Sequence, residues 1–412
     1  MKVVWILNHY AETPNGTSGA RHFYLAKHLA RSGWKTILIA SSVEHPSGKQ
    51  RLSLGESTRF QTVQGVDYLW LRGPSYSGNG RDRILGMLSY SLSVLKPKIR
   101  KELPKPDLIL GSSVHPFSAL SAWALSIIYR VPFVFEVRDL WPQTLVDMGH
   151  LTSKSMLARF FYALEKFLYQ RARKIVVLMP GAAGYISNLG IPKDKIEWIS
   201  NGSDVKSFPA FPEPNNEPFT FMYFGAHGQA NSLITIIEAL RIIKERYNDG
   251  PPPLRVRLIG DGPLKESLID VAKETGLSSE WLSFESSVAK SSLPFVAAES
   301  DAFILALLDL PELYRFGISM NKIFDYMAGA RPILIASNAA NDPVREAECG
   351  FSVPAEKPDL LAKAMLELAQ LPLDARKDLG QRALRHVSER YSYQSLADKL
   401  AVLLDECFFR RT

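Results

Sequence analysis

The sequence predicts an α/β protein of two domains, each built on a largely parallel sheet covered by helices. Three observations support this fold class. The chain has 412 residues and 46% apolar content, enough for more than one hydrophobic core. Short apolar runs alternate with amphipathic stretches along the whole chain, which is typical of parallel sheets. This alternation stops once, in a proline-rich segment, and then starts again.

In the first half, the pattern predicts an opening strand at 3–7, a helix over 19–32 and further strands at 36–41, 107–112, 132–137 and 174–179. Residues 203–218 contain four prolines and two asparagines, which exclude a regular element there. We therefore expect a first domain over 1–204 and a linker over 205–217. A second domain should cover 218–387, and a last helix within 388–412 should return toward the first domain.

In the second half, strands are expected at 219–225, 254–260, 281–286, 301–307 and 331–337, with helices over 233–247 and from Pro263. Ligands of open α/β sheets bind beyond the carboxyl ends of the strands. Two such domains facing each other would therefore share one cleft.

Composition limits the compartment and the partners. Cys349 and Cys407 are the two cysteines, and their separation excludes a disulfide framework or a zinc knuckle, so we expect a reducing cytoplasm. The amino terminus becomes polar after seven residues and no long uncharged apolar stretch follows, which predicts a soluble or peripheral protein. The charge is uneven: residues 1–205 hold 26 Lys and Arg against 14 Asp and Glu, and the rest holds 23 against 28. Charge alone leaves nucleic acid, anionic lipid and an anionic substrate open.

Three segments carry the chemical signal. In LIGDGPLKESL (258–268) a strand ends in a glycine turn and a helix begins at once, so a ligand could approach the backbone, although an ordinary tight turn explains the pattern equally well. In EWISNGSDVKSF (197–208), Asn201 and Gly202 precede the linker; a plain turn is the alternative. In YRFGISMNKIFDYMAGARPILIAS (314–337), a glycine loop leads into a helix whose amino terminus could bind an anion.

These segments in this order, together with FGAHGQANSLITIIEAL (224–240), resemble the retaining glycosyltransferases of the GT-B fold, glycosyltransferase family 4. The likeness is to the bacterial surface-polysaccharide branch that makes O-antigen and capsule, including fucosamine-transferase-like enzymes. GTSGARHFYLAKHLARSGWKTILIAS (16–41) matches the opening loop and helix, and VPFVFEVRDLWPQ (131–143) is similar to an acceptor-side signature.

The resemblance implies a donor site for a nucleotide sugar. Gly19 would admit the donor phosphate, and Asn201 and Gly202 would shape the cleft. Backbone and side-chain donors at the third segment would bind the diphosphate with Lys322 as its counter-charge, and Asp325 would hold the ribose hydroxyls. The full set of expected donor-site residues is Gly19, Asn201, Gly202, Gly225, Gly228, Gly260, Asp261, Gly262, Pro263, Leu264, Ser286, Val288, Ser319, Met320, Asn321, Lys322 and Asp325.

Two departures from the family stand out. Gly317 occupies the place of the first acid of the Glu-x7-Glu motif, whose second acid Asp325 matches. The loop after Gly225 reads Ala-His-Gly-Gln-Ala, without the arginine and lysine that the wider family uses for the diphosphate. The polysaccharide branch shares both departures, so we interpret them as marks of the subfamily.

The acceptor-side candidates are Asp139, Arg138 and His115, which all follow strands. Asp139 is favoured because Arg138 should keep it ionised, whereas a buried histidine beside a proline is more often structural. The resemblance implies front-face substitution, in which the leaving diphosphate accepts the acceptor's proton. The chain has no Asp-x-Asp motif, so we expect neither a metal nor another cofactor.

Two basic segments suggest a reason for the positive charge of the first half. Residues 81–105 and 154–174 place apolar side chains among lysines and arginines, which suits the anionic inner face of the cytoplasmic membrane, although solvated charges over packed helices are the alternative. The side chains concerned are Leu85, Met87, Leu88, Leu92, Leu95, Phe160, Phe161, Phe167 and Tyr169, with Arg81, Arg83, Lys96, Lys98, Arg100 and Lys101. A polyprenyl-diphosphate-linked or other glycan acceptor is then expected, and no nucleic acid.

The expected activity is transfer of an N-acetylated hexosamine or deoxyhexosamine from a UDP-sugar with retention. A UDP-sugar 2-epimerase of similar fold and a non-catalytic nucleotide-sugar-binding protein are the alternatives. A dehydrogenase is disfavoured because no G-x-G-x-x-G follows the first strand. The sequence leaves the sugar, the linkage, the acceptor, the oligomeric state and the pathway open.

Overall fold

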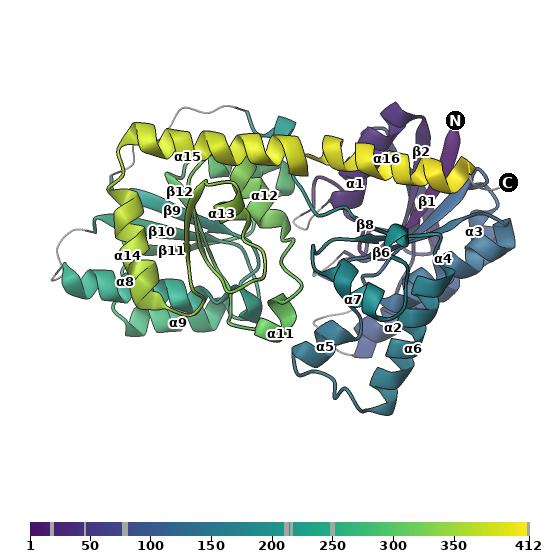
Figure 1. Cartoon of the computed structure of the whole chain (residues 1–412), viewed down its shortest axis with the longest axis horizontal. Coiled ribbons are helices and arrows are strands. Elements are labelled where there is room, and N and C mark those ends of the chain that lie inside the picture. Colours follow the sequence, from purple (N-terminus) through teal and green to yellow (C-terminus); the bar gives the residue numbers. More distant parts are fainter. Residues whose placement is uncertain are drawn as a thin grey trace. The chain divides into compact units, whose positions relative to one another are not determined.

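A computed structural model describes residues 1–16, 20–44, 47–75, 81–209, 214, 217–247 and 252–409. The chain forms two compact units (Figure 1). The first unit comprises residues 1–201 and 393–412, and the second comprises residues 202–392. The division therefore falls after Asn201 and again after Ser392.

The first unit is built on an eight-stranded sheet whose strands follow the order β3-β4-β2-β1-β5-β6-β7-β8. Their bounds are β1 Lys2–Leu7, β2 Trp34–Ser41, β3 Thr58–Val63, β4 Val66–Leu71, β5 Leu108–Ser112, β6 Phe133–Val137, β7 Lys174–Val177 and β8 Ile196–Trp198. All neighbouring pairs are parallel except β3 and β4, which form an antiparallel hairpin at the sheet edge. The turn of this hairpin, Gln64-Gly65, has two positive φ angles, which suits a tight hairpin.

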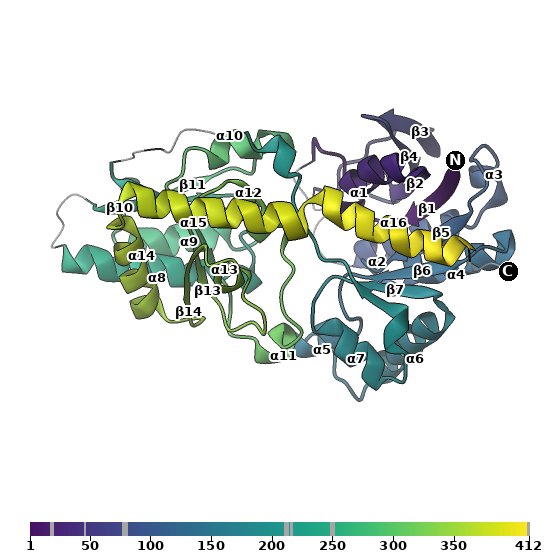
Figure 2. The same ribbon diagram turned by 45° about the horizontal axis from the view of Figure 1, so that its top comes forward.

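The helices of the first unit include one from the far end of the chain. They are α1 Arg21–Leu29, α2 Arg81–Ser93, α3 Pro97–Arg100, α4 Pro116–Tyr129, α5 Gln143–Asp147, α6 Met156–Arg171, α7 Ala182–Asn188 and α16 Tyr393–Phe409, with 3-10 turns at Ala30–Ser32 and Lys193–Lys195. Figure 2 shows α16 running beside α1, and the rings of Tyr24 and Tyr393 stack there at 5.1 Å. Lys2 and Trp34 both bond to Asp405, so this last helix is part of the core of the first unit.

The second unit is built on a six-stranded parallel sheet in the order β11-β10-β9-β12-β13-β14. Its strands are β9 Phe219–Phe224, β10 Leu254–Ile259, β11 Leu282–Glu285, β12 Ala302–Ala306, β13 Ile333–Ala336 and β14 Gly350–Val353. Every residue of β9 and β12 is buried, as continuous apolar runs in a parallel sheet require.

The helices of the second unit connect these strands in turn. They are α8 Leu233–Arg246, α9 Lys265–Glu274, α10 Leu293–Ala297, α11 Pro311–Tyr314, α12 Asn321–Ala328, α13 Pro343–Glu346, α14 Pro358–Ala369 and α15 Leu373–His386. Short turns lie at Val205–Ser207, Gln229–Asn231 and Lys290–Ser292, and a π-helical turn at Val387–Tyr391. The fold class predicted from the sequence, two Rossmann-like parallel-sheet domains, is confirmed. Within the described residues no helix is long and apolar enough to cross a membrane.

Candidate functional site

In the second unit, the loops that follow β9 and β10 touch through their glycines. Gly225 has a φ of 155° and Gly260 a φ of 150°. A Cβ atom on Gly260 would lie 1.9 Å from the carbonyl oxygen of Gly225, and one on Gly262 would lie 2.5 Å from the carbonyl oxygen of His227. The sequence suggested that the glycines of the second loop make room for a ligand. In the structure, the neighbouring loop fills the space that a side chain at Gly260 or Gly262 would need, which is one reason for these glycines; the approach of a ligand to their backbone stays a prediction.

Lys322, in the first turn of α12, reaches the Gly225 loop. Its Nζ donates hydrogen bonds to Tyr223 Oη at 2.8 Å and to Asn231 Oδ1 at 2.6 Å. A Cβ on Gly225 would lie 2.9 Å from this Nζ, so the missing side chain leaves room for the ammonium group. Burial lowers the pKa of Lys322 to about 7. Both partners are neutral, and no carboxylate pairs with Lys322 within the described part of the chain.

Asp261 joins two segments of the expected donor site, the loop that begins at Gly260 and the loop after β11. Its Oδ2 accepts a hydrogen bond from the backbone N–H of Ser287 at 2.9 Å, and its Oδ1 accepts one from Lys265 Nζ at 2.9 Å. These contacts hold the pKa of Asp261 well below its usual range, the bond from Lys265 contributing most. Gly260–Leu264 and Ser286–Val288 therefore lie side by side, with Pro263 and Leu264 exposed.

Asp325, one turn into α12, is engaged by protein groups. Its Oδ1 accepts from Ser203 Oγ at 2.8 Å, and its Oδ2 forms an ion pair with Lys290. The carboxyl side chain is 3% exposed. Burial raises its pKa although Lys290 opposes this. Both carboxyl oxygens therefore have partners in the protein, Ser203 and Lys290, which sequence reasoning missed. The contact of Asp325 with ribose hydroxyls stays a prediction.

The other expected donor-site residues lie around these groups. Ser319 and Met320 lead into α12 and Asn321 begins it, so all three stand at the amino end of the helix that carries Lys322. Asn341 fixes this approach, because its side chain accepts from the backbone N–H of Ile318 and donates to its carbonyl. Gly228 precedes the 3-10 turn Gln229–Asn231. Gly19 lies outside the described residues.

In the first unit, a fully buried carboxylate was missed by sequence reasoning. Glu136 on β6 pairs with Arg21 at 3.0 Å and accepts from His22 Nε2 at 2.8 Å and Ser112 Oγ at 3.0 Å. The charge of Arg21 is the main influence that holds the pKa of Glu136 well below normal against the opposing effect of burial. Arg21 also donates to the carbonyl oxygens of Ile199 and Ser200. This network fixes the segment that leads to Asn201, which is buried, and Gly202, where the second unit starts.

His115 occupies a structural position at the start of α4. Its Nδ1 accepts from the backbone N–H of Ser118 at 3.2 Å, so it caps the helix, and its Nε2 lies 2.9 Å from His9 Nδ1. The residue has no exposed surface, and burial lowers its pKa to about 3. The sequence placed His115 at a cleft surface. The structure instead buries it, which favours the structural interpretation.

Arg138 and Asp139 directly follow β6. The backbone N–H of Arg138 donates to Ser113 Oγ at 3.1 Å, and Asp139 retains an exposed surface. Loss of water around the carboxyl raises the pKa of Asp139, and the nearby charge of Arg138 offsets this only in part. The charge of Arg138 therefore acts in the expected direction and lowers the pKa of Asp139, but it does not outweigh the loss of water. Asp139 is the acceptor-side candidate that remains accessible.

The two basic segments hold fewer accessible groups than the sequence suggested. Met87 and Tyr169 are buried, as is Arg100, which bonds to Tyr129 Oη and the carbonyl oxygen of Leu95. Other large apolar side chains on α2, α4 and α6 are exposed: Ile84, Leu85, Leu88, Leu92, Ile127, Ile128, Met156, Leu157 and Phe160. We call this set the α2/α4/α6 apolar surface. The exposed lysines of this region are Lys96, Lys98, Lys101, Lys105, Lys154 and Lys166.

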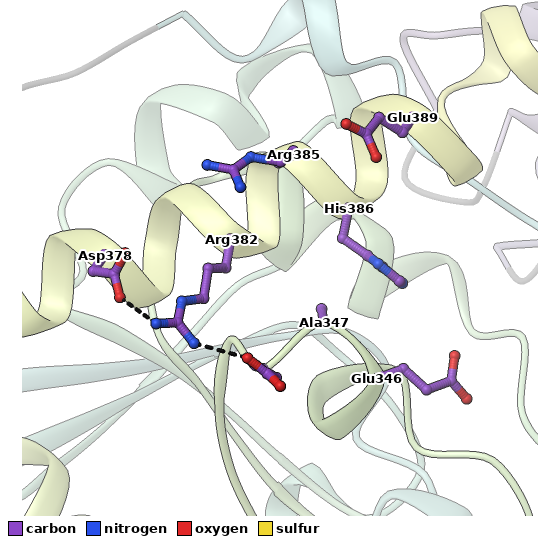
Figure 3. Close-up of a pocket in the computed structure, with 8 residues that line it drawn as sticks. Glu346, Ala347, Asp378, Arg382, Arg385, His386 and Glu389 are labelled. Carbon is purple, nitrogen blue, oxygen red and sulfur yellow. Dashed lines mark hydrogen bonds and ion pairs between the residues drawn. The ribbon is translucent and has the colours of Figure 1, made fainter.

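A separate pocket of about 500 Å³ lies between α13 and α15 in the second unit (Figure 3). Arg382 spans it with ion pairs to Asp378 and Glu348, and Arg385, His386, Glu346 and Glu389 complete most of its lining. It contains none of the residues predicted for the donor site. The described residues also contain no cluster of three or more His, Cys, Asp or Glu side chains suited to a metal ion.

Comparisons with known proteins agree on one class of enzyme. Residues 20–207 match the model for Glycosyltransferase Family 4, and residues 218–370 match the model for Glycosyl transferases group 1. The probable glycosyltransferase WbjE of Pseudomonas aeruginosa is 25% identical over 329 residues, which cover 75% of this chain and 78% of WbjE.

Solved structures share the fold over almost the whole chain. The sucrose-phosphate synthase of Thermosynechococcus elongatus superimposes with a TM-score of 0.75 at 15% identity, covering 99% of this chain and 100% of the synthase. Anabaena HepE, solved with UDP and glucose, gives a TM-score of 0.66 at 15% identity over 98% of this chain and 99% of HepE. WaaG, a glycosyltransferase of lipopolysaccharide biosynthesis, gives 0.65 at 14% identity over 97% and 99%. The two sheets therefore have the GT-B architecture. The family 4 match precedes the group 1 match along the chain, and together with WbjE these matches support glycosyltransferase as the class of enzyme.

Proposed function

We propose that this protein transfers a sugar, an N-acetylated hexosamine or deoxyhexosamine, from a UDP-sugar to a lipid-linked or other glycan acceptor with retention of configuration. The pathway proposed is bacterial surface-polysaccharide synthesis. The observation that carries the proposal is the ammonium group of Lys322, buried against neutral partners at the amino end of α12. A buried cation without a carboxylate partner is costly, and an anionic ligand would offset that cost.

The diphosphate of a nucleotide sugar is an anion that fits this position. The amino end of α12 has no side-chain cap among the described residues and presents the positive end of the helix dipole, to which Lys322 adds a charge. The segments held together by Asp261 would receive the nucleoside. HepE has been solved with UDP-glucose, which supports uridine as the base.

The mechanism we propose uses the protein mainly for positioning and for charge. Lys322 and the end of α12 would stabilise the negative charge that grows on the leaving diphosphate. Asp139 would orient the acceptor hydroxyl, whose proton passes to the departing phosphate oxygen in front-face substitution. No step needs a metal, in keeping with a chain that lacks an Asp-x-Asp motif.

We further propose that the protein works in the cytoplasm at the inner face of the membrane. The α2/α4/α6 apolar surface and its neighbouring lysines supply apolar and cationic groups together, which is the combination that binds anionic lipid. A polyprenyl-diphosphate acceptor would then be reached at the membrane. WaaG is a glycosyltransferase involved in lipopolysaccharide biosynthesis, and its similar fold supports a role in polysaccharide assembly.

A screen of nucleotide sugars tests the donor. A ligand at 100 times its dissociation constant should add about 2.7 kcal/mol of stability, visible as a raised melting temperature. The hit is then incubated with and without a lipid-linked glycan. Transfer that requires the acceptor supports the proposal. An epimerised sugar without acceptor would point to a UDP-sugar 2-epimerase, and binding without any product would point to a non-catalytic protein.

A further inference from the structure

His227 is a buried side chain without a hydrogen-bond partner. The residue lies in the loop after β9 and has no exposed surface. Neither ring nitrogen forms a hydrogen bond with any of the residues described in the structure. Buried polar groups in proteins are nearly always paired, and each unpaired one reduces the free energy of unfolding. This imidazole therefore calls for an explanation beyond the fold.

The backbone of His227, in contrast, has a clear structural role. Its N–H donates to the carbonyl oxygen of Asp261 at 3.0 Å, and its carbonyl accepts from the N–H of Leu264 at 3.1 Å. These two bonds join the β9 and β10 loops and do not depend on the side chain. An apolar residue could make both bonds without leaving two ring nitrogens unpaired.

The surroundings of the imidazole are those of the proposed diphosphate site. Its ring lies 6.1 Å from the ring of Tyr223, whose hydroxyl binds Lys322 Nζ. Burial, with the charges of Lys265 and Lys322, lowers the pKa of His227 to about 4, although Asp261 opposes this. The ring is therefore neutral near pH 7 and carries one N–H donor. Gly225 and Gly228 flank His227, and as glycines they are the positions at which the loop can change its backbone dihedrals when a ligand binds.

We infer that His227 is a phosphate-binding residue, whose ring N–H donates a hydrogen bond to an oxygen of the donor's diphosphate. It would act where the wider family places an arginine and a lysine, and the adjustment of the loop would bring the ring to the ligand. This inference rests on the proposed function, because it takes a nucleoside diphosphate as the ligand. The unpaired imidazole of the free protein would gain its partner on binding.

Two variants and two probes test the inference by calorimetry and ligand-detected NMR. His227→Leu removes the donor and should weaken UDP binding at least about tenfold, as expected for loss of one hydrogen bond to a charged group. The affinity for uridine, which lacks phosphate, should not change. His227→Gln keeps an N–H donor and should bind UDP more tightly than His227→Leu. The free His227→Leu protein should melt no lower than wild type, because the unpaired ring is gone.

His386→Leu is the matched control. His386 is a half-buried histidine of the pocket in Figure 3 whose Nε2 is also buried without a partner among the described residues. This variant should bind UDP like wild type. Unchanged UDP affinity in His227→Leu would overturn the inference, and so would an equal loss for uridine and UDP. If His227→Leu does not fold, His227→Phe, which also lacks the ring N–H donor, takes its place, and an unchanged UDP affinity in His227→Phe would overturn the inference. A wild-type protein that binds no UDP would overturn the proposed function itself.

Discussion

Lys290 and Asp325 form an ion pair inside the second unit, joining the turn after β11 to the second turn of α12. The lysine side chain is 13% exposed and the carboxyl 3%, and Ser203 Oγ donates to the second carboxyl oxygen. The carboxylate that the family would assign to the ribose is thus already held by two protein groups. The pair links the stability of the fold to the geometry of the donor site.

Lys290→Met should lower the melting temperature of the free protein. Removing one partner of a buried pair leaves the other charge uncompensated, and we expect a loss of up to about 3 kcal/mol because the lysine is slightly exposed. The pair Lys273–Asp270 is exposed on both sides, so Lys273→Met is a control that should cost well under about 1 kcal/mol. Equal melting of the two variants would contradict a structural role for the pair.

Donor affinity should fall as the pH rises through about 7. Burial depresses the pKa of Lys322 to about 7 in the free protein, so the ammonium is present below this pH and lost above it. UDP titrations across this range should therefore show weaker binding at high pH. Lys322→Met should bind UDP weakly at every pH. Below pH 7, its binding free energy should be less favourable than that of wild type by roughly 1.5–3 kcal/mol. If the UDP affinity of the wild-type protein stays constant through pH 9, the ammonium group of Lys322 does not bind the diphosphate.

The same depressed pKa has the opposite effect on the stability of the free protein. The unfolded chain keeps the lysine protonated up to its ordinary pKa of 10.5, so it binds more protons than the folded chain above about pH 7. The contribution of Lys322 to stability therefore improves as pH rises between these values. Lys322→Met should abolish this part of the pH dependence of the melting temperature.

Asp139→Asn should suppress turnover and spare nucleotide binding. The carboxyl lies at the end of β6 in the first unit, whereas the nucleotide groups belong to the second, and loss of a group that handles the acceptor hydroxyl costs about a hundredfold or more. Steady-state rates and UDP titrations check both halves of the statement. The exposed Asp82 on α2 gives the control Asp82→Asn, which should keep full activity. Full turnover in Asp139→Asn with the natural acceptor would exclude its role.

Binding to lipid vesicles tests whether the α2/α4/α6 apolar surface and its neighbouring lysines contact a membrane. Replacing Lys96, Lys98, Lys101 and Lys105 by Gln should weaken binding to anionic vesicles by up to about 1 kcal/mol per charge, and added salt should release the wild-type protein. Arg100 is omitted because it is buried. The matched control replaces four exposed lysines of the second unit, Lys273, Lys357, Lys363 and Lys377, and should bind as before. Equal binding of wild type to neutral and anionic vesicles would refute an electrostatic membrane contact.

Glu165 should make the stability of the first unit depend on pH. This buried carboxyl on α6 accepts hydrogen bonds from Tyr169 and Tyr185, and burial raises its pKa to about 8. The folded state then holds a proton that the unfolded state loses above about pH 4.5, so stability falls from there up to about pH 8. Glu165→Gln should flatten the melting temperature over this range. A variant with the same slope as wild type would show that Glu165 is ionised in the folded protein.

Several strands predicted from the sequence, such as β9 and β12, are buried on both faces. The continuous apolar run FTFMYF predicts a buried strand, and β9 lies at this run. The hairpin of β3 and β4 was missed because TRFQTV, on the open edge, is mostly polar and exposed. The second unit's loops were located correctly, since strand ends fix where loops begin.

The partners of the site residues could not be read in the same way. Lys290 stands in a serine-rich turn, and nothing local connects it to Asp325 on another element. Glu136 sits within the strand VFEV, where a buried acid depends on Arg21 and His22 from α1. The glycines of LIGDGP showed that something approaches closely, but only three-dimensional contacts show that it is the neighbouring loop. Pairings of this kind depend on tertiary structure and leave no local pattern.

The return of α16 to the first unit affects the order in which the chain can fold during synthesis. The second unit is one continuous stretch, so all its residues have left the ribosome while the first unit still lacks its final helix. Until Tyr393 and Asp405 emerge, the first unit lacks the ring of Tyr393 that stacks on Tyr24 and the carboxylate of Asp405 that accepts the indole N–H of Trp34. The first unit, which supplies the opening strand of the chain, is therefore completed only after the last residue of the second unit has emerged.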